Sequence, residues 1–138
     1  FVFGFSMSLG AISAQNSMVY ANEENVAIEG YDVVAYFTDY QAVRGSKTFS
    51  TTHDGAIYYF VTQEHLDAFN ANADKYLPQY GGYCAFALAK HNAKVPVDPT
   101  EFMINDGKLY LFFNDFYQGT PFNAIVPWVN NESAMKEM

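Results

Sequence analysis

The sequence predicts an α+β fold, in which one small domain packs short helices against an antiparallel sheet of hairpins. Asp54-Gly55 and Asp106-Gly107 each stand between two short apolar runs, and Asp-Gly in that setting is a strong signal for a β-hairpin. Residues 63–72, which lie between the two hairpins, have the apolar spacing of a helix. Hairpins mixed with short helices favour this class over a doubly wound parallel sheet.

The first half of the domain is expected to contain two strand-rich segments. Residues 33–37 are β-branched and aromatic after the turn at Gly30-Tyr31-Asp32, and we predict a buried strand there. Residues 48–52 and 57–61 form the first predicted hairpin.

The predicted helix over residues 63–72 begins after Thr62, a suitable N-cap. Leu66, Phe69 and Ala73 follow at spacings of three and four and are expected to face the core. One further turn over residues 74–78 should end at Pro78.

In the second half, Gly81-Gly82 allows a tight bend, and a second helix is predicted over residues 83–90 with Gly82 as its N-cap. Residues 98–101 read Asp-Pro-Thr-Glu, which predicts a short helical turn. Residues 102–104 and 109–113 form the second predicted hairpin, and a tail helix is predicted from Ser133.

The amino-acid composition favours some kinds of binding partner and disfavours others. The chain has 138 residues, of which half are hydrophobic and 18% aromatic, and only 16% are charged against about 25% in ordinary globular chains. We therefore expect a partner or a membrane to cover some aromatic surface. A net charge of −8 with scattered Lys and Arg disfavours nucleic acid as a partner.

Residues 1–22 carry no charged side chain and are expected to be a signal-peptide-like or anchor segment. The apolar run at residues 1–12 resembles the core of a secretory signal and is shorter than the roughly 20 residues that span a bilayer. It is either a retained part of a signal or an uncleaved anchor held by a membrane or another subunit. A buried helix of the domain is disfavoured by its interrupting Ser, Gly and Asn. The protein is thus predicted to be periplasmic or secreted, with its domain over residues 23–138, including a C-terminal tail.

Several motifs, in order, resemble the secreted YHS-domain proteins, over roughly residues 26–114. They are Gly30-Tyr31-Asp32-Val33-Val34-Ala35-Tyr36-Phe37, Tyr59-Phe60-Val61-Thr62, His65, Phe69, Lys75-Tyr76, Tyr80-Gly81-Gly82-Tyr83-Cys84-Ala85, Val97-Asp98-Pro99 and Asp106-Gly107-Lys108-Leu109-Tyr110-Leu111. The resemblance implies a small α+β domain and a metal-related role, since metal binding through a cysteine pair has been proposed for the family. Here His65 stands where the family often has cysteine, and Cys84 is the only cysteine.

Cys84 and His65 are the candidate metal ligands. In the first turn of a helix, a thiol meets free N–H groups that favour the thiolate, which is a soft ligand for Cu(I). His65 could supply an imidazole toward the Cys84 loop. Closed zinc sites take four N or S ligands, so a copper ion fits this small donor set better. The alternative is that Cys84 is a buried apolar residue and His65 a surface or capping residue.

Other candidates have weaker signals. Tyr31, Tyr80 and Tyr83 lie beside glycines and could form the rim of a pocket or a protein interface. His53, by a hairpin turn, and His91, at a helix end, are expected to be structural.

Two functions follow from these patterns. The first is a non-catalytic binding module, with a transition metal, preferably copper, near Cys84 and His65. The alternative is an accessory subunit of a membrane or envelope complex, bound through residues 1–22 and an aromatic surface, without metal. Enzyme chemistry is disfavoured: a cysteine hydrolase would need a residue that orients His65, and none is identifiable in the sequence.

Overall fold

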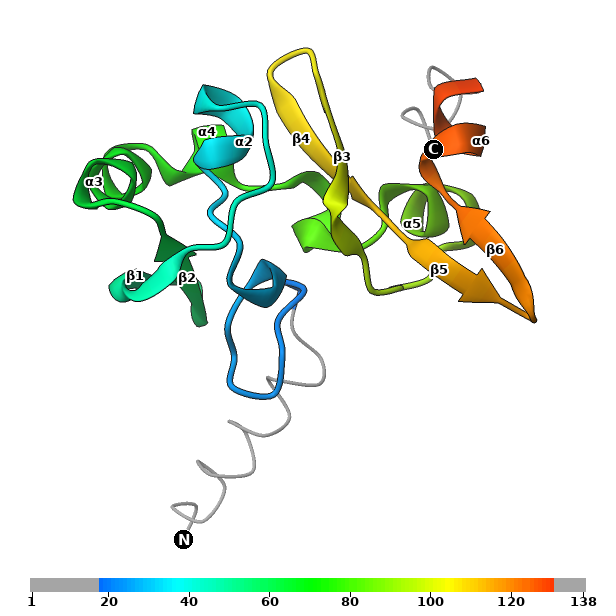
Figure 1. The fold of residues 1–138 in the computed structure, drawn as a ribbon, viewed down its shortest axis with the longest axis horizontal. Coiled ribbons are helices and arrows are strands. Elements are labelled where there is room, and N and C mark those ends of the chain that lie inside the picture. Colours follow the sequence, from blue (N-terminus) through cyan, green and yellow to red (C-terminus); the bar gives the residue numbers. More distant parts are fainter. Residues whose placement is uncertain (1–17, 131–138) are drawn as a thin grey trace, which may run out of the picture.

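The computed structural model describes residues 18–130 and has the predicted α+β architecture. The structure contains three separate two-stranded antiparallel sheets (Figure 1). Short helices connect the first sheet to the second, whereas Phe113 alone connects the second to the third. The strands are β1 (Ser46–His53), β2 (Ala56–Phe60), β3 (Asp98–Asn105), β4 (Lys108–Phe112), β5 (Asn114–Tyr117) and β6 (Thr120–Asn123). The helices are η1 (Ile28–Gly30), α2 (Ala35–Thr38), α3 (Gln63–Ala71), α4 (Ala73–Tyr76), η2 (Gln79–Gly82), α5 (Ala85–His91) and α6 (Ile125–Asn130).

Both predicted hairpins are confirmed. β1 pairs with β2 across Asp54-Gly55, and β3 pairs with β4 across Asp106-Gly107. All four turn residues have positive φ, between 49° and 86°. Positive φ at both central residues gives a two-residue turn the twist of the flanking strands, and Asp-Gly adopts it at low cost.

The prediction of a strand over residues 33–37 is wrong, because the chain turns there into α2. The Oδ1 atom of Asp32 accepts hydrogen bonds from Val34 N (2.8 Å) and Ala35 N (3.1 Å), which starts a helical turn. Residues 33–36 are buried, as predicted, and Phe37 is half-buried, but a short buried apolar run does not distinguish a strand from a helix.

The predicted helical turn over residues 98–101 is also wrong. The Oδ1 atom of Asp98 does accept from Thr100 N (3.0 Å), as in a capped turn. The backbone nevertheless joins β3, where Asp98 pairs with Phe112, and the Pro99 carbonyl accepts from the Tyr36 hydroxyl (2.7 Å). Contacts with distant residues therefore determine the conformation here.

The predicted N-terminus is correct for α3, whereas α5 begins later in the chain than predicted. The Thr62 hydroxyl accepts from His65 N (3.1 Å), so Thr62 is the N-cap of α3, with Phe69 buried and Leu66 and Ala73 half-buried. The second helix starts at Ala85 with Cys84 as its N-cap instead of Gly82, because residues 79–82 form η2.

The structure describes only part of the two terminal segments for which predictions were made. Residues 18–22, predicted as the end of the signal or anchor segment, are bonded to the domain: Tyr20 N donates to Gly81 O (2.7 Å), and Tyr20 O accepts from Ile28 N (3.0 Å). The rest of that segment and the tail helix predicted from Ser133 lie outside the described residues. Within residues 18–130, no helix is long and apolar enough to cross a membrane.

The bend at Gly81-Gly82 is confirmed, with φ of 65° and 89°. A Cβ at Gly81 would overlap the Met18 carbonyl group, so this glycine lets the N-terminal segment approach the η2 backbone. We expect Gly81→Ala to lower the free energy of unfolding by about 2–4 kcal/mol, from left-handed strain and from the clash. Urea unfolding measures this loss.

Gly107→Ala is the matched control, because Gly107 also has positive φ (74°) but nothing lies within 4 Å of a Cβ built there. It should lose about 1 kcal/mol from strain alone. Equal losses in the two variants would show that the Met18 contact does not matter.

Candidate functional site

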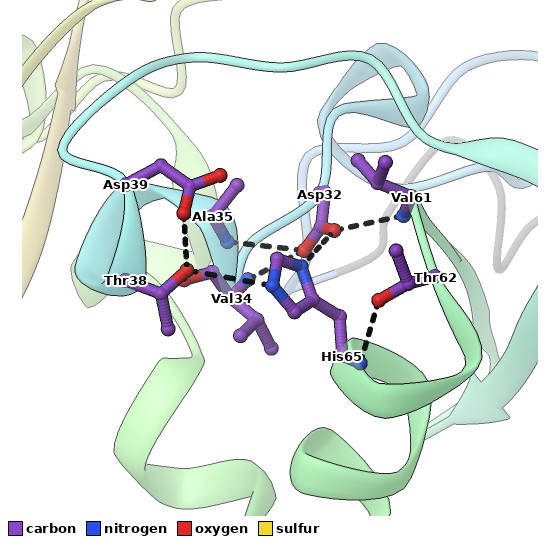
Figure 2. A network of polar contacts seen from close by, with 8 residues as sticks. All are labelled: Asp32, Val34, Ala35, Thr38, Asp39, Val61, Thr62 and His65. Carbon is purple, nitrogen blue, oxygen red and sulfur yellow. Dashed lines mark hydrogen bonds and ion pairs between the residues drawn. The ribbon is translucent and has the colours of Figure 1, made fainter.

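His65 is held by a buried carboxylate (Figure 2). Its Nδ1 atom lies 2.7 Å from the Oδ2 atom of Asp32, and Asp32 has no exposed surface. The same Oδ2 accepts from Val61 N (2.8 Å), and Oδ1 caps α2. Asp32 therefore joins the start of α2, the end of β2 and the first turn of α3.

The other side of the imidazole faces Thr38, with 3.5 Å between its Nε2 atom and the Thr38 Oγ1 atom (Figure 2). Hydroxyl, imidazole and carboxylate in this order are the parts of a hydrolase triad. However, Thr38 Oγ1 lies nearer to two other acceptors, Val34 O (3.3 Å) and Asp39 Oδ1 (3.1 Å). The Thr38 hydroxyl therefore has two acceptors nearer than His65, and the group links α2 to α3.

Cys84 lies in a different part of the molecule. It is fully buried as the N-cap of α5, its N–H donates to Val95 O (3.0 Å), and it forms a parallel bridge with Leu111 of β4. α3, which carries His65, and α5 stand at opposite sides of Figure 1. The structure therefore does not bring Cys84 and His65 together.

This arrangement does not fit a metal ion shared by the two predicted ligands. His65 is oriented by Asp32, and Cys84 has no exposed surface. Over residues 18–130, no group of three or more His, Cys, Asp or Glu side chains could hold a metal ion. Copper binding at either residue alone stays a prediction from the sequence.

An apolar cavity of about 290 Å³ opens between α5, its following loop and the β5–β6 hairpin. We call it the apolar cavity; its walls are Cys84, Phe86, Ala87, His91, Ala93, Val95, Phe113, Tyr117, Phe122 and Ala124. Cys84 and Ala124 are its most buried members, while the Tyr117 residue is 59% exposed. Cys84 thus forms part of the wall of the apolar cavity.

The β5–β6 hairpin is exposed along nearly its whole length. Phe116 is 67% exposed, and Phe122 and the valines Val126 and Val129 of α6 are also exposed. Figure 1 shows the hairpin reaching outward at one end of the molecule, beside α5 and α6. Large apolar side chains are thus concentrated around the apolar cavity, as at protein-binding surfaces.

A second hollow, of about 300 Å³, shares the lining residue Phe113 with the apolar cavity. We call it the acidic hollow; its walls are Glu29, Pro96, Val97, Asp98, Pro99, Phe113, Asn114 and Asp115. Among the described residues, none of its three carboxylates forms an ion pair with Lys or Arg. Arg44 donates to the backbone carbonyl of Glu29 (3.2 Å), not to the carboxylate.

The pKa values of two neighbouring tyrosines are raised, first by burial and then by nearby negative charge. Burial raises the pKa of Tyr36 well above its usual range, and nearby Tyr31, Asp98 and Glu29 raise it further. Burial also raises the pKa of Tyr20, helped by its hydrogen bond to Glu29 Oε2 (2.6 Å). The acidic hollow is therefore a region where an added cation would be stabilised.

The three tyrosines predicted as a pocket rim do not lie around one space. Tyr80 lines a separate hollow with Asp106 and Lys108. Tyr31 lies under the Arg44 guanidinium, 4.8 Å from the ring centre. Tyr83 packs against Tyr20, with ring centres 5.6 Å apart, and burial raises its pKa.

The two remaining histidines differ from each other. His53 lies 3.4 Å from Asp54 and packs edge-on against Phe69, so its contacts are structural, as predicted. His91 ends α5 and also lines the apolar cavity, with its ring edge-on to Phe86 at 5.9 Å.

Comparisons with known proteins add no relative to this picture. No family model, no curated protein and no solved structure matches the chain. The likeness to secreted YHS-domain proteins therefore stays a prediction carried by the motifs.

Proposed function

We propose that this chain is a non-catalytic binding module that captures an apolar side chain of a partner protein in the apolar cavity. The observation that carries the proposal is the cavity itself, framed by exposed aromatic side chains on a projecting hairpin. The role agrees with the accessory-subunit alternative, in which an aromatic surface makes the contacts.

The size of the cavity favours a side chain over a free ligand. Small-molecule sites usually hold about 300–1,000 Å³, so 290 Å³ is at the lower limit. Protein interfaces, in contrast, are often centred on one aromatic or aliphatic anchor that fills a pocket of this kind. The exposed Phe116 and Tyr117 would lie beside such an anchor and exclude water around it.

The setting is proposed to be extracytoplasmic, as residues 1–22 and the resemblance to secreted YHS-domain proteins suggest. A non-catalytic role is supported by the Thr38 hydroxyl, which has two acceptors nearer than the His65 Nε2 atom. Metal binding remains a separate proposal, tested by elemental analysis of untagged protein beside Cys84→Ala and His65→Ala.

Peptide selection on the full chain tests the proposed function. We expect peptides selected from a random phage-displayed library to carry a Phe, Trp or Leu anchor. Ala93→Phe, which fills the apolar cavity from its half-buried wall, should weaken their binding by about tenfold or more, the size of a lost anchor contact. Fluorescence anisotropy measures the affinity.

The matched control is Ala71→Phe, which adds the same side chain to the exposed end of α3, away from the cavity. Unchanged unfolding curves would show that both variants are folded. If no selected peptide distinguishes Ala93→Phe from Ala71→Phe, the apolar cavity is not a binding site and the proposal fails.

A further inference from the structure

We infer that the partner segment recognised at the apolar cavity is basic, with Lys or Arg placed a few residues from its apolar anchor. The inference rests on the proposed function and adds the chemistry of the partner. It is carried by the position of the acidic hollow, which shares Phe113 with the apolar cavity.

The two spaces are close enough for one peptide segment to occupy both. Phe113 lines both spaces and immediately precedes β5, whose residues Asn114 and Asp115 line the acidic hollow while Tyr117 lines the apolar cavity. Asp115 and Tyr117 are two residues apart and therefore lie on the same face of the strand, about 7 Å from each other along it. An anchor in the apolar cavity therefore brings the neighbouring residues of a bound segment to the acidic hollow.

The charges select a cation for the second space. Glu29, Asp98 and Asp115 lie around it without a Lys or Arg ion-pair partner among residues 18–130. Glu101 lies nearby, bonded through Oε1 to the side chain of Asn123 in β6 (2.8 Å). Carboxylates that form no ion pair with Lys or Arg and lie beside an apolar surface favour a partner of opposite charge.

The same charges disfavour other occupants. A second copy of the chain would bring a further net charge of −8 against this acidic surface. An anionic lipid surface would be repelled for the same reason. A basic protein segment with an apolar anchor satisfies both spaces at once.

The test uses the peptides selected on the full chain, with two independent readouts. We expect Lys and Arg to be enriched among peptides that Ala93→Phe excludes. Asp98→Asn and Asp115→Asn should each weaken these peptides by about threefold, as for partly exposed charge pairs. Both substitutions keep a side-chain oxygen that can accept the local bonds from Thr100 and Phe116. Binding should also weaken as salt is raised.

The control removes two charges elsewhere: Glu64→Gln with Asp67→Asn, on exposed positions of α3. It should leave binding unchanged. Cavity-dependent peptides without enrichment of Lys and Arg, or peptides insensitive to both aspartate variants, would overturn the inference and leave the proposed function standing. Absence of cavity-dependent peptides would overturn both.

Discussion

Asp32→Ala is expected to lower the free energy of unfolding by about 3–5 kcal/mol, because it removes a buried acceptor and leaves its hydrogen-bond donors without a partner. The carboxylate has no exposed surface and accepts from three backbone N–H groups, those of Val34, Ala35 and Val61. It also binds His65 Nδ1 at 2.7 Å. Urea unfolding followed by circular dichroism measures the loss, which is a large part of the 5–15 kcal/mol typical of a domain.

Three further variants separate the contributions. Asp32→Asn keeps one acceptor oxygen and should lose less, about 1–3 kcal/mol. His65→Ala leaves the three backbone bonds to Asp32 in place and should also lose less than Asp32→Ala. Asp39→Ala, at an exposed neighbouring position, should change stability by no more than about 0.5 kcal/mol. Equal losses in Asp32→Ala and His65→Ala would contradict the assignment of Asp32 as the cap of α2.

The parts of the fold that were predictable are those with a local code. Asp54-Gly55 and Asp106-Gly107 specify their turns through the φ preferences of two adjacent residues, and Thr62 caps α3 within four residues. No distant contact is needed for these signals, so sequence alone is sufficient.

The predictions of secondary structure were wrong where two local signals competed, or where pairing with a distant strand determined the conformation. Residues 33–37 read as a strand from side-chain type, whereas Asp32 could have been recognised as a cap for the following turn. Asp98 reads as a helix cap and does make the local bond, but pairing with Phe112 of β4 places it in β3.

The apolar cavity and the surroundings of His65 were harder to predict than the first two hairpins. The β5–β6 hairpin turns at Gln118-Gly119, with φ of 52° and 82°, and Gln-Gly is a weaker turn signal than Asp-Gly. Asp32 and His65 are 33 residues apart in sequence, so their contact depends on the folded arrangement. Cys84, predicted from the sequence either as a metal ligand or as a buried apolar residue, is fully buried and lines the apolar cavity.

Trp128→Ala should be comparably destabilising, with a loss of about 3–5 kcal/mol from the large cavity it leaves. Trp128 of α6 has no exposed surface and packs against Tyr110 and Phe112 of β4, with ring centres 5.4 and 5.6 Å apart. Its Nε1–H group has no hydrogen-bond partner among the described residues, so packing alone holds the indole. Chemical unfolding followed by far-ultraviolet circular dichroism avoids dependence on the lost tryptophan signal.

Trp128→Phe tests the unpaired N–H group. It should lose only about 1–2 kcal/mol, because removal of a buried donor without a partner offsets part of the cavity cost. Val129→Ala is the control on the same helix: Val129 is about half exposed, and its change should stay within about 0.5 kcal/mol. If Trp128→Ala and Val129→Ala unfolded alike, α6 would not be anchored as described.

The same variants connect the core to the proposed function. Trp128 N donates to Ala124 O (3.4 Å), and Ala124, whose N–H donates to Phe113 O (2.9 Å), forms a wall of the apolar cavity. Trp128→Ala keeps these backbone bonds but removes the packing of the indole on Tyr110 and Phe112 of β4. α6 should then hold Ala124 against Phe113 less firmly, and the cavity should open. Trp128→Ala is thus expected to weaken the cavity-dependent peptides even under conditions where the protein remains folded. Unchanged peptide binding to folded Trp128→Ala would show that the cavity forms independently of α6.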